Sequence, residues 1–179
     1  MTMCGLERYK IDLKGLTDEV TTLEWDLDDS FFEALDETEV ERGALHVSLS
    51  IRKASGFFEL LFHTVGTVSI VCDRCLDLME QPIATDNQLV VKLGSTCSED
   101  DDTVTVDENE GILDTSWFIY EFIALAIPIQ HVHAPGKCNP AMTQALEELS
   151  ADRSGDEASS RTVDPRWEKL LKLKEKSEE

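Results

Sequence analysis

Alternation of apolar and polar residues over short runs is the feature that most constrains the fold of this chain. In ALHVSLSIRKA, apolar residues recur at every second position from Leu45 to Ile51. This spacing places them on one face of a β-strand, because successive side chains of a strand point to opposite faces. Further strands are predicted over residues 7–13, 20–27, 57–65, 66–75, 82–94 and 101–108. Ser55-Gly56 and Gly66 fall where turns are needed, which predicts an antiparallel meander.

Helical periodicity follows the predicted strands. The run DTSWFIYEFIALAI predicts an apolar helix over about residues 114–127, capped at Asp114 or Thr115 and stopped by Pro128. Its apolar residues are Trp117, Tyr120, Phe122, Ile123 and Ala124. A shorter helix is expected at SFFEAL, capped by Asp28 or Asp29. The predicted fold class is α+β, with an antiparallel, barrel-like or strongly curved β-sheet, a packed helix and a C-terminal amphipathic helix.

The composition of the last 40 residues indicates how the chain is divided. Residues 1–149 are predicted to form one β-rich domain, which ends in a modest helix at AMTQALEELS. Residues 150–163 are rich in Ser, Gly, Asp and Glu, and this composition predicts a flexible polar linker. The pattern of residues 164–179 predicts an amphipathic helix that starts with Asp164-Pro165. A lone helix of this length is marginal, so it is expected to dock on its own domain or on a partner.

An excess of acidic residues limits the classes of partner. Thirty-seven acidic and sixteen basic residues give a formal net charge of -21. A field of this sign repels nucleic-acid phosphates, so little direct binding of naked RNA is expected, and a basic protein partner fits better. The alternative is that the charge only keeps the protein soluble. No run of about 18 apolar residues and no apolar signal core occur, so a cytoplasmic protein without a membrane span is expected.

Three of the five cysteines have a spacing typical of a metal site. Cys72 and Cys75 form a CxxC pair, and the segment IPIQHVHAPGKCNP supplies His133 and Cys138, four residues apart around a Pro-Gly turn. Two cysteines from one tight turn and two further ligands complete a tetrahedral Zn²⁺ site that is closed and structural. His131 is the substitute if His133 points away, because alternate residues of an extended segment share a face.

The sequence allows two other interpretations of the cysteines. The CxxC pair can be a redox pair, although such a pair normally begins a helix and here it ends a strand. The thiols can also be free of metal in a simple hairpin. The chain has no glycine-rich phosphate loop, nucleophile elbow or HExxH motif, which favours a protein that is not an enzyme.

The ordered motifs resemble the YceD family, the large ribosomal RNA subunit accumulation proteins of bacteria and plastids. The resemblance spans roughly residues 40–175. It rests on Cys72, Cys75, Pro128, His133, Cys138 and the run Asp164-Pro165-Arg166-Trp167. Many members have more cysteines in the segment around 133–140, and His133 stands here where some have a cysteine.

The resemblance implies a role without catalysis in ribosome biogenesis, supporting large-subunit assembly and accumulation of 23S rRNA. Together with the charge, it favours a basic large-subunit ribosomal protein or a pre-ribosomal particle as partner. The run Asp164-Pro165-Arg166-Trp167 is the candidate partner-binding segment, as the start of a docking helix. The alternative function is a zinc-dependent or thiol-redox enzyme that uses Cys72 and Cys75. A third possible function is that of a generic protein-interaction domain unrelated to ribosomes.

Overall fold

The computed structural model describes residues 6–35, 39–94, 98–100 and 103–149. Contacts divide the chain into two compact units, Met1–Thr143 and Gln144–Glu179. The predicted linker at 150–163 and the predicted helix at 164–179, including Asp164 to Trp167, lie outside the described residues. None of the helices in the described part of the chain has the length and apolar character needed to cross a membrane.

The described elements alternate little between helix and strand, as expected for an α+β chain. In chain order they are a 3-10 helix η1 (Glu7–Tyr9), β1 (Lys10–Asp12), β2 (Val20–Leu27), α1 (Asp29–Leu35), β3 (Arg42–Ala54), β4 (Phe57–Val71), β5 (Leu78–Gly94), β6 (Ser98–Asp100), β7 (Thr103–Asp107), β8 (Ile112–Asp114), α2 (Ser116–Leu125) and α3 (Pro140–Leu149). The mixed α+β class is confirmed. The predicted strand at 20–27 is found with those bounds, whereas the one at 7–13 begins with η1 and continues as β1.

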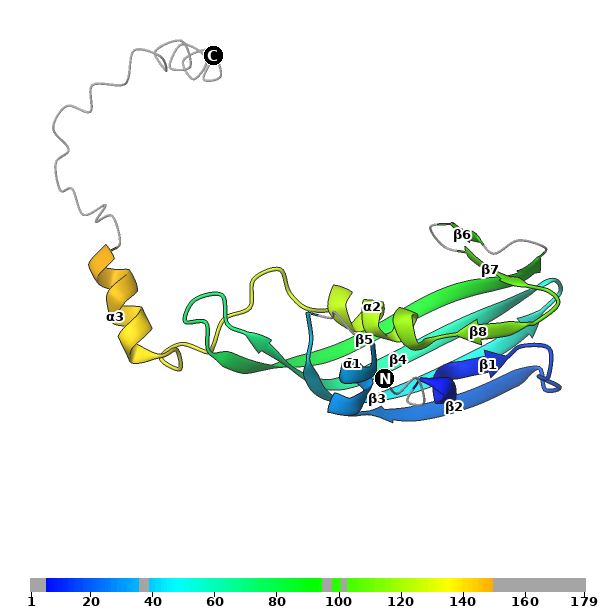
Figure 1. Cartoon of the computed structure of the whole chain (residues 1–179), viewed down its shortest axis with the longest axis horizontal. Helices are drawn as coiled ribbons and strands as arrows, with labels where there is room; N and C mark the ends of the chain where they lie inside the picture. The colour runs from blue at the N-terminus through cyan, green and yellow to red at the C-terminus, as the bar shows by residue number, and fades with distance from the viewer. Residues whose placement is uncertain (1–5, 36–38, 95–97, 101–102, 150–179) are drawn as a thin grey trace, which may run out of the picture. The chain divides into compact units, whose positions relative to one another are not determined.

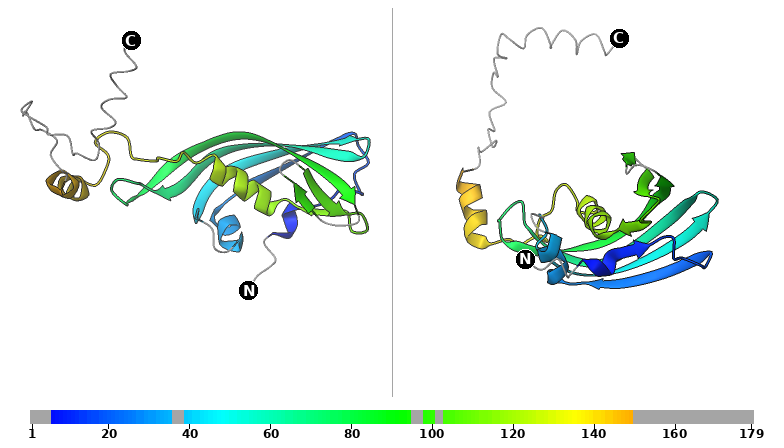
Figure 2. Two further views of the ribbon diagram at one scale, coloured as in Figure 1. Left: turned by 90° about the horizontal axis from the view of Figure 1, so that it is seen from above. Right: turned by 45° about the vertical axis from the view of Figure 1, so that its right-hand side comes forward.

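In the described part of the chain, six strands form the main sheet, in the order β2-β3-β4-β5-β7-β6, and β1 pairs with β8 in a separate two-stranded sheet. In the first unit, α1, α2 and the β1–β8 pair lie over one face of the main sheet (Figure 1). The strands twist and curve along their length (Figure 2). The described strands form an open sheet with β2 and β6 at its ends, so the barrel-like alternative is not confirmed.

One strand pair corrects the prediction of a purely antiparallel sheet. β5 and β7 are parallel, with Val90 opposite Thr103 and Gly94 opposite Asp107. β6 explains this direction, because it pairs with β7 in antiparallel fashion and so turns the chain back before β7 begins. The acidic turn after β5 therefore contains a short strand, and β7 runs in the same direction as β5.

The turn predicted at Gly66 is wrong. β4 runs from Phe57 to Val71 without interruption and pairs with β3 and β5 on both sides of this glycine. A Cβ atom at Gly66 would lie 2.3 Å from the Ala44 carbonyl oxygen and 2.5 Å from the Leu45 Cα atom. Glycine is therefore needed for the close approach of β3 and β4, and the predicted strands 57–65 and 66–75 form one strand up to Val71.

The core lies between the main sheet and the elements on its inner face. Leu45, Val47, Leu49 and Ile51 of β3 are buried on that face, as the alternation predicted. α2 is placed within two residues of the predicted helix, and the Asp114 carboxylate accepts the backbone N–H of Ser116 at 3.0 Å. α2 also packs on the sheet, because the ring of Phe122 lies 5.2 Å from the ring of Phe62, a residue of β4. This packing fixes where the chain leaves α2.

Candidate metal centre

The CxxC pair lies in the turn that joins β4 to β5. The Cys72 N–H donates to the Asp77 carbonyl oxygen, and the Leu76 N–H donates to the Cys72 carbonyl oxygen, both at 2.9 Å. The tight turn forces Leu76 to a φ of 63°, a left-handed conformation that is uncommon for a bulky side chain. Both thiols are buried, with Cys72 0% and Cys75 2% exposed. The hairpin therefore holds two sulfur atoms away from solvent.

The segment after α2 is attached to this hairpin by hydrogen bonds. The Asp73 N–H donates to the His131 carbonyl oxygen at 3.0 Å, and the His131 N–H donates to the Asp73 carboxylate at 2.8 Å. Farther along, the side-chain amide of Asn139 donates to the Asp77 carboxylate at 3.1 Å. These contacts bracket His133 and Cys138 and bring them to the two cysteines of the hairpin.

Cys72, Cys75, His133 and Cys138 offer ligand atoms that all lie within 4.8 Å of one another. The Cys75 Sγ and His133 Nδ1 atoms are 3.3 Å apart. Around Zn²⁺, with metal–sulfur bonds near 2.3 Å and metal–nitrogen bonds near 2.0 Å, neighbouring ligand atoms are roughly 3.5–3.8 Å apart. Shifts of about an ångström would give that spacing. Three thiols and one imidazole are also the donors that Zn²⁺ prefers, so the residues present fit this metal.

The electrostatics of the sulfur atoms differ within the cluster. Burial raises the pKa of the Cys72 thiol, but hydrogen bonds from the backbone N–H groups of Cys75, His133 and Arg74 outweigh burial and lower the pKa to about 6. Burial and the neighbouring Cys75 and Cys72 sulfurs raise the pKa of the Cys138 thiol. Without a cation, three thiolates at this separation would repel one another, whereas a bound divalent ion would compensate their charge.

His131 does not belong to the cluster and has a different contact. Its Nδ1 atom lies 3.0 Å from the Pro128 carbonyl oxygen, and its Nε2 atom lies 3.4 Å from the Asp73 carboxylate. The predicted substitute ligand therefore anchors the segment to the hairpin. Sequence analysis missed Asp73, Asp77 and Asn139 as the residues that hold the two halves together. The available signal in the sequence was that each of these residues lies within two positions of a candidate ligand.

The adjacent basic residues Arg52 and Lys53 both make contacts within the chain. The Arg52 guanidinium donates to the Glu59 carboxylate, and the Lys53 ammonium lies 3.5 Å from the Leu16 carbonyl oxygen. The Lys53 ammonium also lies 6.0 Å from the centre of the Phe58 ring. The Arg52 charge is therefore paired with a carboxylate, whereas Lys53 keeps its charge, and both residues are exposed.

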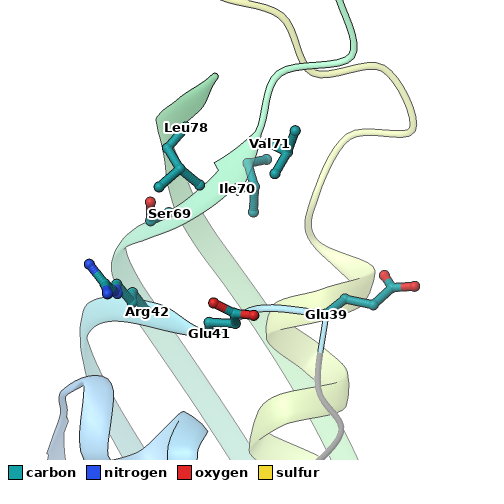
Figure 3. A pocket seen from close by; sticks show the side chains of 7 residues that line it. All are labelled: Glu39, Glu41, Arg42, Ser69, Ile70, Val71 and Leu78. Carbon is teal, nitrogen blue, oxygen red and sulfur yellow. The ribbon is translucent and has the colours of Figure 1, made fainter. Parts of the chain in front are cut away.

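A small pocket lies next to the hairpin, on the β3 side of β4 (Figure 3). Its lining consists of Glu39, Glu41, Arg42, Ser69, Ile70, Val71 and Leu78. Its volume of about 200 Å³ is below the roughly 300–1,000 Å³ of sites that enclose a drug-sized ligand. No thiol or imidazole is among its lining residues. The pocket is therefore separate from the four clustered residues.

Comparison with known proteins identifies a family. Residues 60–174, more than half of the chain, match the model of the family described as large ribosomal RNA subunit accumulation protein YceD. The matched range includes all four clustered residues. Neither a search of curated proteins nor a search of solved structures gave a match.

Proposed function

The chain belongs to the YceD family of large ribosomal RNA subunit accumulation proteins, and we propose that it supports large-subunit assembly as a binding protein for a basic ribosomal protein. The family description implies a role in accumulation of the large ribosomal RNA subunit. The observation that carries the finer proposal is the net charge of -21. An acidic surface increases the association rate with a basic partner. It also competes with RNA for that partner and so limits premature contact between the two.

A sucrose-gradient profile of cells that lack the gene tests the assembly role. The expected result is a reduced large-subunit peak with less 23S rRNA, and restoration of both by the intact chain. Normal large subunits and normal 23S rRNA would contradict the proposal. The same cells, complemented with a Cys138→Ser variant, would show whether the cluster is needed for this role.

The choice between a protein partner and RNA has its own test. Binding to a basic ribosomal protein is expected to weaken steeply above physiological salt, because exposed charges are then screened over about 8 Å or less. Naked fragments of 23S rRNA are expected to bind poorly under the same conditions. Tight RNA binding that is insensitive to salt would show that the partner is RNA.

The cluster of Cys72, Cys75, His133 and Cys138 supports a structural role for Zn²⁺. When bound, the ion would supply charge compensation and four short bonds between the β4–β5 hairpin and the segment after α2. All four ligand positions would be filled by the protein, which is typical of structural sites and leaves no open position for a substrate. Elemental analysis of protein purified without added metal or chelator tests this site, and one equivalent of zinc is the expected result.

A thiol-redox enzyme is the alternative function for Cys72 and Cys75. The position of the pair at the end of β4, away from the start of a helix, gives this alternative less support. Thiol–disulfide exchange that is lost in a Cys72→Ser variant would favour it over a structural metal site.

A further inference from the structure

Among the strands that the structure describes, β5 has no partner along one long side. β5 pairs with β4 along Leu78–Val91, but β7 pairs only with Val90–Gly94. Residues 78–89 therefore have a neighbouring strand on one side alone, among the residues that the structure describes. Figure 1 shows how much farther β5 extends than β7. This uncovered stretch is named the β5 edge.

Pro82 identifies which backbone groups face outward along the β5 edge. Proline has no N–H, so within a sheet its nitrogen is confined to the side that makes no ladder hydrogen bond. The Pro82 carbonyl oxygen agrees with this orientation, since it accepts the Gln81 side-chain amide at 3.1 Å. Backbone groups of a strand alternate between its two sides, so the N–H and C=O groups of Glu80, Ala84, Asp86 and Gln88 also face outward.

These outward groups are available for pairing. Within the described residues, no backbone hydrogen bond joins them to anything on the side away from β4. Unpaired backbone groups are rarely buried, because burial without a partner costs free energy, so they face water here. The side chains of Glu80, Ala84, Asp86 and Gln88 are exposed as well. An edge of this kind is a template for an added strand.

The charge of the β5 edge selects the occupant. No lysine or arginine occurs between Arg74 and Lys92, whereas Asp77, Glu80 and Asp86 are acidic. Exposed edges are commonly protected by lysine, and this edge has acidic residues and one proline in its place. A second copy of the chain is a poor occupant, because each copy has a net charge of -21.

We propose that the β5 edge, from Glu80 to Gln88, binds an extended segment rich in lysine and arginine by strand addition. This inference rests on the proposed function and specifies how a basic partner is held. Main-chain hydrogen bonds to the edge provide affinity, and the acidic side chains select a basic sequence. Pro82 interrupts the row of donors, so the outward N–H groups come from Glu80 on one side of it and from Ala84, Asp86 and Gln88 on the other.

The test uses the full chain and an acetylated, amidated peptide of alternating lysine and valine, about eight residues long, which can form one exposed strand. Ala84→Pro removes one outward N–H and leaves the hydrogen bonds to β4, and it is expected to weaken binding about fivefold. Pro82→Ala restores a donor and is expected to tighten binding by a similar factor. The matched control peptide is N-methylated at alternate residues, which removes its own donors and keeps its charge.

Amide hydrogen exchange distinguishes strand addition from charge attraction, because charge attraction alone would not slow exchange at alternate backbone amides. Peptide binding is expected to slow exchange at Glu80, Ala84, Asp86 and Gln88, with little change at Ile83 and Thr85, which already pair with β4. Equal binding of the N-methylated peptide, or no binding of the unmodified one, would overturn the proposal. So would self-association of the chain that Ala84→Pro abolishes. Because no ribosome enters this test, its failure is distinct from a failure of the assembly role.

Discussion

On the inner face of the sheet, Leu49, Phe62 and Ile119 are 0–2% exposed, whereas Leu76 and Leu78 at the hairpin end are 65% and 62% exposed. The inner face is held by apolar packing between the sheet and α2. The hairpin end buries its two thiols and exposes its leucines, and hydrogen bonds through Asp73 and Asp77 join it to the segment after α2. One unit thus uses apolar burial for its core and polar groups for its candidate metal centre.

Because the inner face and the hairpin end are held by different interactions, we expect destabilising changes in the two regions to affect different parts of the unit. Loss of core packing should destabilise the whole unit, because strands and helix share the same buried surface. Loss of the metal should loosen the hairpin and its attached segment while the sheet remains folded. Four variants or treatments test this difference.

The largest effect is expected at Phe62, whose ring packs against that of Phe122. Phe62→Ala is expected to lower the free energy of unfolding by about 3–5 kcal/mol, because it removes a buried aromatic side chain and leaves a cavity. Urea denaturation followed by circular dichroism measures the change. Leu61→Ala is the matched control, since Leu61 is 46% exposed on the other face, and a loss as large as that at Phe62 would contradict the assignment of the core.

Metal removal should have the second largest effect. At a free zinc concentration of 100 times Kd, binding stabilises the folded chain by about 2.7 kcal/mol, and a chelator should remove this contribution. Hydrogen exchange should show faster exchange at residues 72–77 and 131–138, with the amides of β3 unchanged. The control is Cys138→Ser, which should respond weakly to the chelator. A chelator without effect on the intact chain would indicate a hairpin without metal.

Asp73 tests the hydrogen bonds that position the second pair of ligands. Asp73→Ala removes the acceptor of the His131 N–H and is expected to cost about 1 kcal/mol in free energy of unfolding. It should also weaken zinc binding, measured by competition with a chromogenic chelator. Asp86→Ala removes a carboxylate that contacts His63 on the exposed face and should change stability by about 0.5 kcal/mol or less. Equal effects of the two variants would show that the hairpin contacts have no special role.

The smallest effect concerns the backbone of Leu76. A bulky residue in the left-handed region is strained, so Leu76→Gly is expected to raise the free energy of unfolding by about 0.5 kcal/mol, after the entropy cost of glycine is subtracted. Leu76→Ala removes the same exposed side chain but keeps the backbone strain, and it should give no gain. Thermal denaturation of the zinc-loaded proteins measures both, and a loss of stability in Leu76→Gly would argue against strain in this turn.

The four candidate ligands could be found from the sequence because ligand type and local spacing are local properties. CxxC in one turn, and His133 and Cys138 on either side of Pro-Gly, indicate two pairs. The structure brings the pairs together, although Cys75 and His133 are 58 residues apart along the chain. The prediction of His133, with His131 as the substitute, agrees with the cluster, and the structure adds the physical reason, because His131 contacts Asp73 and Pro128.

The sequence by itself determined the α+β class, the buried face of β3 and the bounds of β2, because side-chain alternation directly reflects which face of a strand is buried. Only the tertiary structure decided the continuity of β4 through Gly66, the parallel pairing of β5 with β7, and the unpaired β5 edge. Glycine permits both a turn and a close approach of strands, and only the position of Ala44 distinguishes them here. Strand pairing depends in the same way on contacts between distant segments, which local periodicity does not encode.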